Sequence, residues 1–316
     1  MRAFVFPGQG AQTVGMGRDL AQAYPAAAAV FEEVDAALGE GLSRLIWDGP
    51  EETLLLTANA QPALMATSLA AMRALAAEGV DVEAARFVAG HSLGEYSALC
   101  AAGALSLADT ARLLRTRGQA MQKAVPVGVG AMAAILGLDL AAAREVADEA
   151  AKGGDGGEVC QAANDNDPAQ VVISGHKGAV ERAVEIARAR GAKRAILLPV
   201  SAPFHCALMQ PAAEVMAEAL GRVEIRPPRV PVVSNVRAEG VTQPDEIRTL
   251  LVEQVTGAVR WRESVQWMAA QGVREFVEIG AGKALSGMVR RIDRELAARA
   301  VNTAAEVREL AVALNG

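Results

Sequence analysis

The pentapeptide Gly90-His91-Ser92-Leu93-Gly94 constrains the fold more than any other part of the sequence. It matches G-x-S-x-G and lies directly after the apolar segment 86–89 and directly before a run of helix-forming residues. In α/β enzymes such a pattern forms a sharp turn from strand to helix, with the serine exposed at its tip. The following helix points its free N–H groups at that serine. The pattern therefore predicts an α/β fold with Ser92 as a candidate nucleophile.

Apolar segments alternate with long Ala- and Leu-rich stretches over the first part of the chain. This alternation is typical of parallel strands joined by helices. We expect strands at 2–7 and 86–89, and helices at 18–38, 61–78, 95–102 and 107–124.

The pattern changes to shorter units at about residue 127. Expected there are a strand, a helix, two strands, a helix and a strand, at 131–138, 140–151, 159–163, 170–174, 178–190 and 194–200. This βαββαβ order is typical of a ferredoxin-like unit. The Gly-rich segment 153–157 lacks a P-loop lysine and follows a helix, so we interpret it as a flexible surface turn.

Strands at 230–235 and 275–279 and a terminal helix are expected to return to the first sheet. The predicted architecture is thus a large hydrolase-like α/β domain with a parallel sheet core, formed by residues 1–126 and 201–316. A small ferredoxin-like domain, residues 127–200, is inserted into it.

Composition excludes several classes of protein. The 316 residues are 52% hydrophobic and carry a net charge of −6, the wrong sign for binding nucleic acid through the overall field. We find no membrane-spanning segment or secretory signal. Cys100, Cys160 and Cys206 have neither disulfide nor zinc-site spacing, so we expect no metal and a cytoplasmic location.

A serine nucleophile needs a base, and the chain has three histidines. His91 adjoins Ser92 on a tight turn, so its side chain should point away from the hydroxyl. His176 lies at an expected helix start, where a surface or capping role is favoured. His205 follows an expected strand, in the kind of loop that carries catalytic groups in α/β proteins. We therefore predict that His205 is the base.

Four separated motifs carry a resemblance to a known family: Phe6-Pro7-Gly8-Gln9-Gly10, GHSLGEYSAL at 90–99, Arg117-Gly118, and Ala202-Pro203-Phe204-His205-Cys206. Together they resemble the malonyl-CoA:acyl-carrier-protein transacylases of bacterial fatty-acid synthesis. The resemblance covers essentially the whole chain, including the inserted domain. It implies that Ser92 accepts a malonyl group from malonyl-CoA and passes it to the phosphopantetheine thiol of acyl carrier protein. It implies no permanently bound cofactor, and we expect a monomer.

The resemblance also implies roles for other residues. The backbone N–H groups of Gln9 and Leu93 would form the oxyanion hole, although Pro-Gly-Gln-Gly is equally typical of a simple strand terminus. The backbone carbonyl of Gln254 would orient His205. Arg117 would clamp the malonyl carboxylate, because a planar guanidinium binds a carboxylate at two points. From the sequence alone, Arg117 is an ordinary helical arginine.

Further implied residues line the substrate and partner sites. Met121 and Phe204 would be pocket walls. Asn164 and Asn166 are candidates for contact with the thioester, and Asn-Asp-Asn-Asp-Pro is equally typical of a turn. An acidic carrier protein needs a basic rim, for which the candidates are Arg188, Arg190, Lys193, Arg194, Arg260 and Arg262. A solvated helix end explains the same charges.

Two other functions remain open at this stage. A thioesterase or lipase would use the same elbow with water as acceptor, although no acidic triad member is evident before His205. A nucleotide-binding module would use Gly8-Gln9-Gly10, but Thr13 occupies the third glycine position of that fingerprint.

Overall fold

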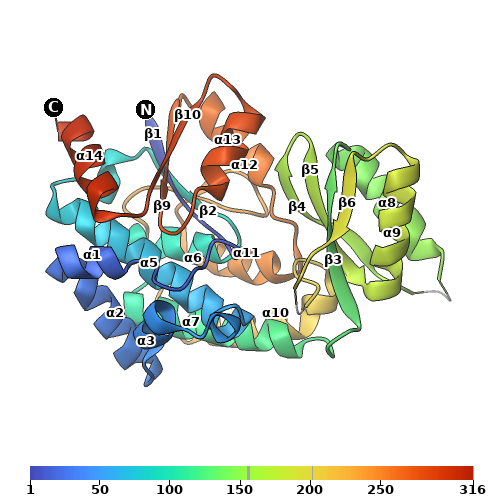
Figure 1. Cartoon of the computed structure of the whole chain (residues 1–316), viewed down its shortest axis with the longest axis horizontal. Coiled ribbons are helices and arrows are strands. Elements are labelled where there is room, and N and C mark those ends of the chain that lie inside the picture. The colour runs from blue at the N-terminus through green and yellow to red at the C-terminus, as the bar shows by residue number, and fades with distance from the viewer. Residues whose placement is uncertain (155–156, 201, 316) are drawn as a thin grey trace.

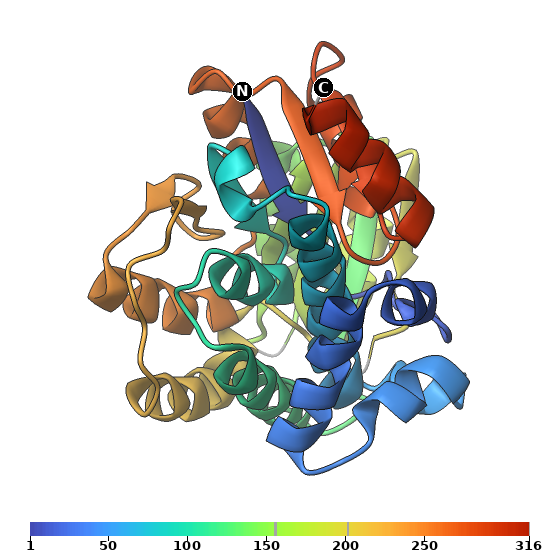
Figure 2. The same ribbon diagram turned by 90° about the vertical axis from the view of Figure 1, so that its left-hand side faces the viewer.

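Two sheets form the framework of the computed structural model, which describes residues 1–154, 157–200 and 202–315. Within these residues the larger sheet has six strands, in the spatial order β10 (Ala297–Val301), β9 (Glu275–Ile279), β1 (Arg2–Phe6), β2 (Phe87–Gly90), β7 (Val232–Val233) and β8 (Gly240–Val241). Figure 1 shows the smaller sheet with its helices on the right and the remainder of the chain on the left. Both termini lie at one end of the molecule (Figure 2).

Strand direction determines where a site can form. β1 pairs in parallel with β2 and β9, and β7 and β10 extend the parallel arrangement, whereas β8 is antiparallel to β7. The last residues of β1 and β2, Phe6 and Gly90, lie side by side. Because ligands bind at the carboxyl ends of the strands in open α/β sheets, this edge is where chemistry is expected.

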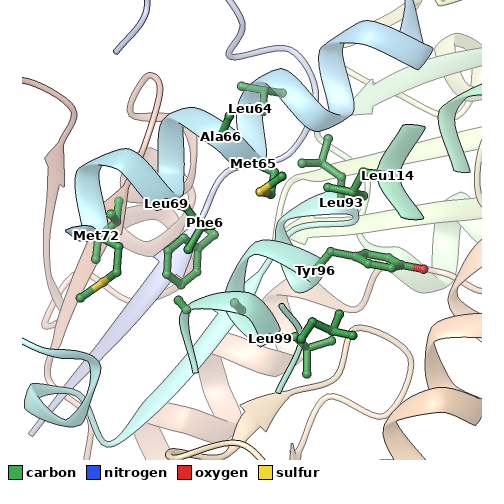
Figure 3. Packing of buried hydrophobic residues seen from close by; sticks show 14 of the residues in the cluster. Phe6, Leu64, Met65, Ala66, Leu69, Met72, Leu93, Tyr96, Leu99 and Leu114 are labelled. Carbon is green, nitrogen blue, oxygen red and sulfur yellow. The ribbon is translucent and has the colours of Figure 1, made fainter. Parts of the chain in front are cut away.

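Alternate residues of β1 pack into different cores, as the two-residue period of a strand requires. Phe4 and Phe6 belong to the core that contains residues of α5 (Thr57–Ala77) and α6 (Leu93–Ala101). Figure 3 shows Phe6 between Leu69 of α5 and helix α6. Ala3 and Val5 point the other way, into a core with residues of α12 (Trp261–Ala270) and α13 (Ala284–Ile292).

The other helices complete the large part of the molecule. They are α1 (Arg18–Ala23), α2 (Pro25–Leu38), α3 (Leu42–Asp48), α4 (Glu51–Leu54), α7 (Leu107–Lys123), α10 (Gln210–Gly221), α11 (Pro244–Thr256) and α14 (Ala304–Asn315), with short 3-10 turns at Val82–Ala84 and Ala207–Met209. In the described part of the chain, no helix has both the length and the apolar character that crossing a membrane requires.

The smaller sheet has the predicted βαββαβ order. Its elements are β3 (Gly130–Leu136), α8 (Leu140–Lys152), β4 (Cys160–Asp167), β5 (Gln170–His176), α9 (Lys177–Ala189) and β6 (Arg194–Leu197). The strands are antiparallel, in the order β4-β5-β3-β6. Ile135 and Ile173 pack against the two helices, whereas Met132 and Val172 join the core of the large part. The predicted fold class is confirmed; the domain boundaries stay a prediction.

Several sequence predictions are wrong in detail. The helix expected at 18–38 is two helices, because Tyr24 before Pro25 is extended and the proline starts the second. The Asn-Asp-Asn-Asp segment lies in β4 rather than in a turn, and β6 ends at Leu197. Strand β10 and helices α3, α4 and α10–α13 were not predicted. Within the Gly-rich segment 153–157, residues 155–156 lie outside the described residues.

Candidate active site

The turn between β2 and α6 places Ser92 at the carboxyl edge of the sheet. Ser92 has a φ of 53°, a conformation that costs a non-glycine residue energy and is typical of a nucleophile elbow. A Cβ atom at Gly90 would lie 1.9 Å from the carbonyl oxygen of Gly94, and one at Gly94 would lie 2.2 Å from that of Phe6. Both glycines of the pattern are therefore required by close packing around the turn.

His205 meets Ser92 although the two residues are 113 positions apart in the sequence. Its Nε2 atom lies 2.8 Å from the Ser92 hydroxyl oxygen. Its Nδ1 atom lies 2.9 Å from the carbonyl oxygen of Gln254 and 3.1 Å from that of Gly257. Since carbonyl oxygens only accept, Nδ1 carries the proton and Nε2 is left to accept the Ser92 hydrogen.

The electrostatic environment keeps His205 neutral. Burial, followed by the positive charge of Arg117, lowers the pKa of His205 to about 3. A neutral imidazole with a free Nε2 can take a proton from the serine hydroxyl. Two backbone carbonyls thus stand where a triad hydrolase has a carboxylate.

Arg117 is the third group at this point. It lies on α7 and is 1% exposed. Its Nη2 atom donates to the Ser92 hydroxyl oxygen at 3.1 Å and to the Gln254 side-chain oxygen at 2.9 Å, and its Nη1 atom donates to Gln61 at 2.8 Å. A Cβ atom at Gly118 would lie 2.6 Å from the Cα atom of Ala58, so this glycine lets α7 approach α5 and bring the guanidinium inside.

No carboxylate neutralises Arg117 directly among the described residues, and its Nε atom has no hydrogen-bond partner there. Burial lowers the pKa of Arg117, yet an arginine stays protonated in proteins. A buried cation with neutral partners, beside a nucleophilic hydroxyl, favours a reacting group that carries its own negative charge.

Comparison with known proteins agrees with this geometry. The family model described as "Acyl transferase domain" matches residues 3–310. The chain is 49% identical over 310 residues to the malonyl CoA-acyl carrier protein transacylase of Bacillus subtilis (strain 168), covering 98% of this chain and 96% of the relative. The chain belongs to the family of malonyl CoA-acyl carrier protein transacylases.

Solved structures of family members superpose closely on this one. The acyl-carrier-protein-S-malonyltransferase from Bartonella henselae has a TM-score of 0.96 and 55% identity, covering 100% of this chain and 99% of its own. A second structure, a malonyl-transacylase in complex with a type II polyketide acyl-carrier protein, has a TM-score of 0.93 and 45% identity, covering 97% of each chain.

The remaining residues expected of a family member lie around the same edge. Gln9 is in the exposed turn after β1, and its side chain donates to the Thr57 hydroxyl at 3.1 Å. Leu93 is the first residue of α6, so its N–H belongs to the first turn, whose donors lack intrahelical acceptors. Met121 is buried one turn beyond Arg117, with its sulfur 3.7 Å from the Gln61 amide nitrogen. Phe204 is buried beside His205.

The two asparagines of β4 are placed differently from each other. The side-chain oxygen of Asn166 lies 2.9 Å from Nε2 of His91, whose ring thus points away from the Ser92 hydroxyl. Asn164 is buried and forms an isolated bridge with Val259. The structure therefore connects Asn166 with the elbow through His91 and gives Asn164 a backbone contact between the two parts of the chain.

Most of the basic residues expected to form a docking rim are paired with carboxylates. Arg190 pairs with Glu145 and Glu149 of α8, which balances its charge, and Arg188 pairs with Glu185. Arg260 and Arg262 pair with Glu263 and Asp165. Lys193 and Arg194 are exposed and belong to no ion pair within the described residues. The docking prediction therefore rests on these two.

The structure also bears on the interpretations of His176 and of the Gly8-Gln9-Gly10 turn. His176 stands at the start of α9 but does not cap it with its side chain; instead its Nδ1 atom accepts from the backbone N–H of Val159 at 2.8 Å. The Gly8-Gln9-Gly10 turn does not open a helix, since α1 begins only at Arg18. A dinucleotide loop needs that helix, so the structure gives no support to nucleotide binding.

Four residues that place a polar side chain or a backbone carbonyl at the site were not predicted from the sequence: Gln61, Glu95, Asn235 and Gly257. Only Glu95 had a local signal, because it follows Ser92 by three positions and so lies over the same first turn of α6. The other three come from separate elements, and nothing in their own neighbourhood marks them.

Proposed function

We propose that this chain transfers a malonyl group from malonyl-CoA, through an ester on Ser92, to the phosphopantetheine thiol of acyl carrier protein, supplying extender units for fatty-acid synthesis. The observation that carries the proposal is the meeting of three groups at one point. The Ser92 hydroxyl oxygen is within 3.1 Å of both a neutral imidazole acceptor and a buried guanidinium. The family's named activity agrees with this chemistry.

In the first half-reaction His205 Nε2 takes the proton of the Ser92 hydroxyl as the oxygen attacks the thioester carbon. A bond forms between the Ser92 oxygen and that carbon, and the carbonyl π electrons move onto its oxygen. The carbonyl then re-forms, the bond to the CoA sulfur breaks, and the sulfur leaves with the proton held by His205. CoA is released, and Ser92 carries the acyl group.

The second half-reaction reverses these roles with a new thiol. The carrier's phosphopantetheine thiol gives its proton to His205 and attacks the ester carbon of acyl-Ser92. When the ester bond breaks, His205 returns the proton to the Ser92 oxygen. The backbone N–H groups of Gln9 and Leu93 are proposed to hold the negative oxygen in both steps, at a gain of about 3 kcal/mol for each donor.

Arg117 is proposed to select the malonyl group. In a malonyl ester the free carboxylate is two carbon–carbon bonds from the reacting carbon, so its partner must lie close to the Ser92 oxygen. Arg117 does, through its Nη2 atom. Met121 is buried one turn beyond Arg117, and Phe204 is buried beside His205. We propose that these two side chains limit the space around the acyl chain.

The decisive experiment is mass analysis of the Ser92 peptide after brief exposure to malonyl-CoA without any acceptor. We expect one malonyl group on this peptide, because the ester should persist until a thiol arrives. Modification of a different peptide, or release of CoA without any covalent intermediate, would contradict the mechanism.

A serine hydrolase using the same groups would hydrolyse the ester instead. Adding a carrier protein after the loading step separates the two functions. Transfer of the malonyl group to the carrier thiol supports the acyltransferase, whereas rapid appearance of free malonate in the absence of a carrier supports the hydrolase.

Lys193 and Arg194 are proposed to bind the acidic carrier protein, because they are the two of these basic residues without a carboxylate partner in the described part of the chain. Reversing both charges, Lys193→Glu with Arg194→Glu, should raise the carrier-protein KM several-fold and leave loading by malonyl-CoA unchanged. Arg222→Glu, at an exposed arginine at the end of α10 that pairs with Glu218, is the control for a charge reversal elsewhere on the surface. Equal effects on both half-reactions would count against this docking site.

Two properties of the protein in solution are also proposed. The three free cysteines favour a reducing compartment, the cytoplasm. A monomer is expected, because the site is built from one chain.

A further inference from the structure

Glu95 is a carboxylate in the interior that the transfer mechanism does not use. It lies in the first turn of α6 and is 3% exposed. It forms no ion pair among the described residues, although burial of an unpaired charge is costly. One of its oxygens, Oε2, accepts from the Gln254 side-chain amide at 2.7 Å and from the backbone N–H of Asn235 at 3.1 Å.

Gln254 connects this carboxylate with the clamp. Its Nε2 atom donates to Glu95 and, at 3.0 Å, to the backbone carbonyl of Ser92. Its Oε1 atom accepts from Arg117 at 2.9 Å. If the amide were rotated by half a turn, its oxygen would face the Glu95 carboxylate and its nitrogen would face the guanidinium, and both contacts would be repulsive. Glu95 therefore determines which end of the amide faces Arg117.

Asn235 connects the same carboxylate with the nucleophile. Its backbone N–H is held by Glu95, and its side-chain oxygen accepts from the backbone N–H of Ser92 at 2.8 Å. Its amide nitrogen donates to the carbonyl oxygen of Gly90 at 2.7 Å. Both sides of the strained elbow are thus held by the Asn235 side chain, while the backbone N–H of the same residue donates to Glu95.

The charges around Glu95 are consistent with a carboxylate retained for positioning. Burial raises the pKa of Glu95 to about 7, while the Gln254 and Asn235 N–H groups and the positive charge of Arg117 act in the opposite direction. Above that pKa the ionised carboxylate faces Arg117 through Gln254 and stabilises the cation without occupying the side that a substrate would use.

We propose that Glu95 is a positioning residue for acyl-group selection: by fixing the Gln254 amide, it holds the Arg117 guanidinium where the carboxylate of a malonyl group can bind. This inference rests on the proposed function, since it assumes that the acyl group carries a carboxylate. An acetyl group makes no use of the clamp, so its loading depends on Ser92 and His205 but not on the orientation of the Gln254 amide. The two side-chain hydrogen bonds from Asn235 to the elbow do not include Glu95 and are expected to remain when Glu95 is replaced.

The test compares malonyl and acetyl loading in three variants at about pH 8, above the Glu95 pKa of about 7. Glu95→Ala removes the acceptor and should lower malonyl loading by roughly 10- to 100-fold, the effect of a buried hydrogen bond to a charged group. Its acetyl loading should change much less. Glu95→Gln keeps an acceptor oxygen at the same reach and should retain most of the malonyl preference. Glu95→Asp keeps the charge but shortens the side chain, and this variant should lose the malonyl preference.

Ser97→Ala is the matched control, because Ser97 is buried on the same helix and its hydroxyl has no hydrogen-bond partner in the described part of the chain. It should leave both loading rates unchanged. Equal losses of malonyl and acetyl loading in Glu95→Ala would show a structural role only and overturn the proposal. So would an aspartate variant that keeps the preference while the glutamine variant loses it.

Two further outcomes are separable. If Glu95→Ala does not fold, the aspartate and glutamine variants decide the question between them. If the unaltered protein itself does not load malonyl on Ser92, the proposed function fails before the role of Glu95 is tested.

Discussion

Ser92→Ala is expected to lower the rate of malonyl transfer at least about 10⁴-fold, because removal of a nucleophile from a covalent mechanism leaves only binding and oxyanion stabilisation. The hydroxyl oxygen that disappears is the one within 2.8 Å of His205 and 3.1 Å of Arg117. The measurement is transfer of radiolabelled malonyl to carrier protein, together with the mass of the peptide that contains position 92.

Stability should change little in this variant. The backbone at position 92 is strained with φ at 53°, and alanine meets the same steric restriction as serine. The N–H at this position still donates to Asn235. Thermal unfolding of the variant therefore serves as its control. A Ser92→Ala protein that unfolds normally and transfers malonyl at full rate would end the covalent mechanism.

Arg117→Ala is expected to abolish the preference for malonyl over acetyl, which should fall by roughly 10⁴-fold. The reason is that a site with a buried charge disfavours a ligand that leaves this charge unpaired, and the variant no longer has the charge. Malonyl loading should be lost, whereas acetyl loading should persist or increase. Competition between malonyl-CoA and acetyl-CoA, read by mass at Ser92, measures the ratio directly. Equal losses of malonyl and acetyl loading would show that Arg117 does not select the malonyl group.

The same variant has a second, independent readout. Arg117 lowers the pKa of His205 by charge repulsion, in addition to the larger effect of burial. Without Arg117 the His205 pKa should rise. Because the base works only when neutral, the fall of acetyl loading at acidic pH should then begin at a higher pH than in the unaltered protein. An unchanged acidic limb would contradict the assigned electrostatic coupling.

Ser92 could be predicted as a candidate nucleophile because the G-x-S-x-G pattern is local. Gly90, Ser92 and Gly94 stand at fixed spacing between an apolar strand and a helix. The contact that excludes a Cβ at Gly90 lies within this turn, whereas the one at Gly94 is with Phe6 of β1. The βαββαβ order could also be predicted, because the period of the hydrophobic residues distinguishes strands from helices over short windows. His205 followed by elimination among three histidines.

Other sequence interpretations missed partners that lie on another element. In the sequence, Arg190 is a candidate docking charge, but its two terminal nitrogens form ion pairs with Glu145 and Glu149 on α8. The Asn-Asp-Asn-Asp segment has the composition of a turn, yet pairing with β5 holds it in a strand. In both cases a nonlocal contact overrides the local preference.

The sequence by itself predicted the βαββαβ order of the smaller unit and the strand–turn–helix around Ser92, and it indicated Ser92 and His205 as candidate nucleophile and base. Only the tertiary structure decided which polar side chains surround them. Arg117 is indistinguishable along the chain from its helical neighbours Arg112 and Arg115. The structure makes it a candidate clamp, because its guanidinium is buried and bonded to Gln61 and Gln254, 56 and 137 positions away. Burial and hydrogen-bond partners depend on packing between distant segments, and no local pattern of residues encodes them.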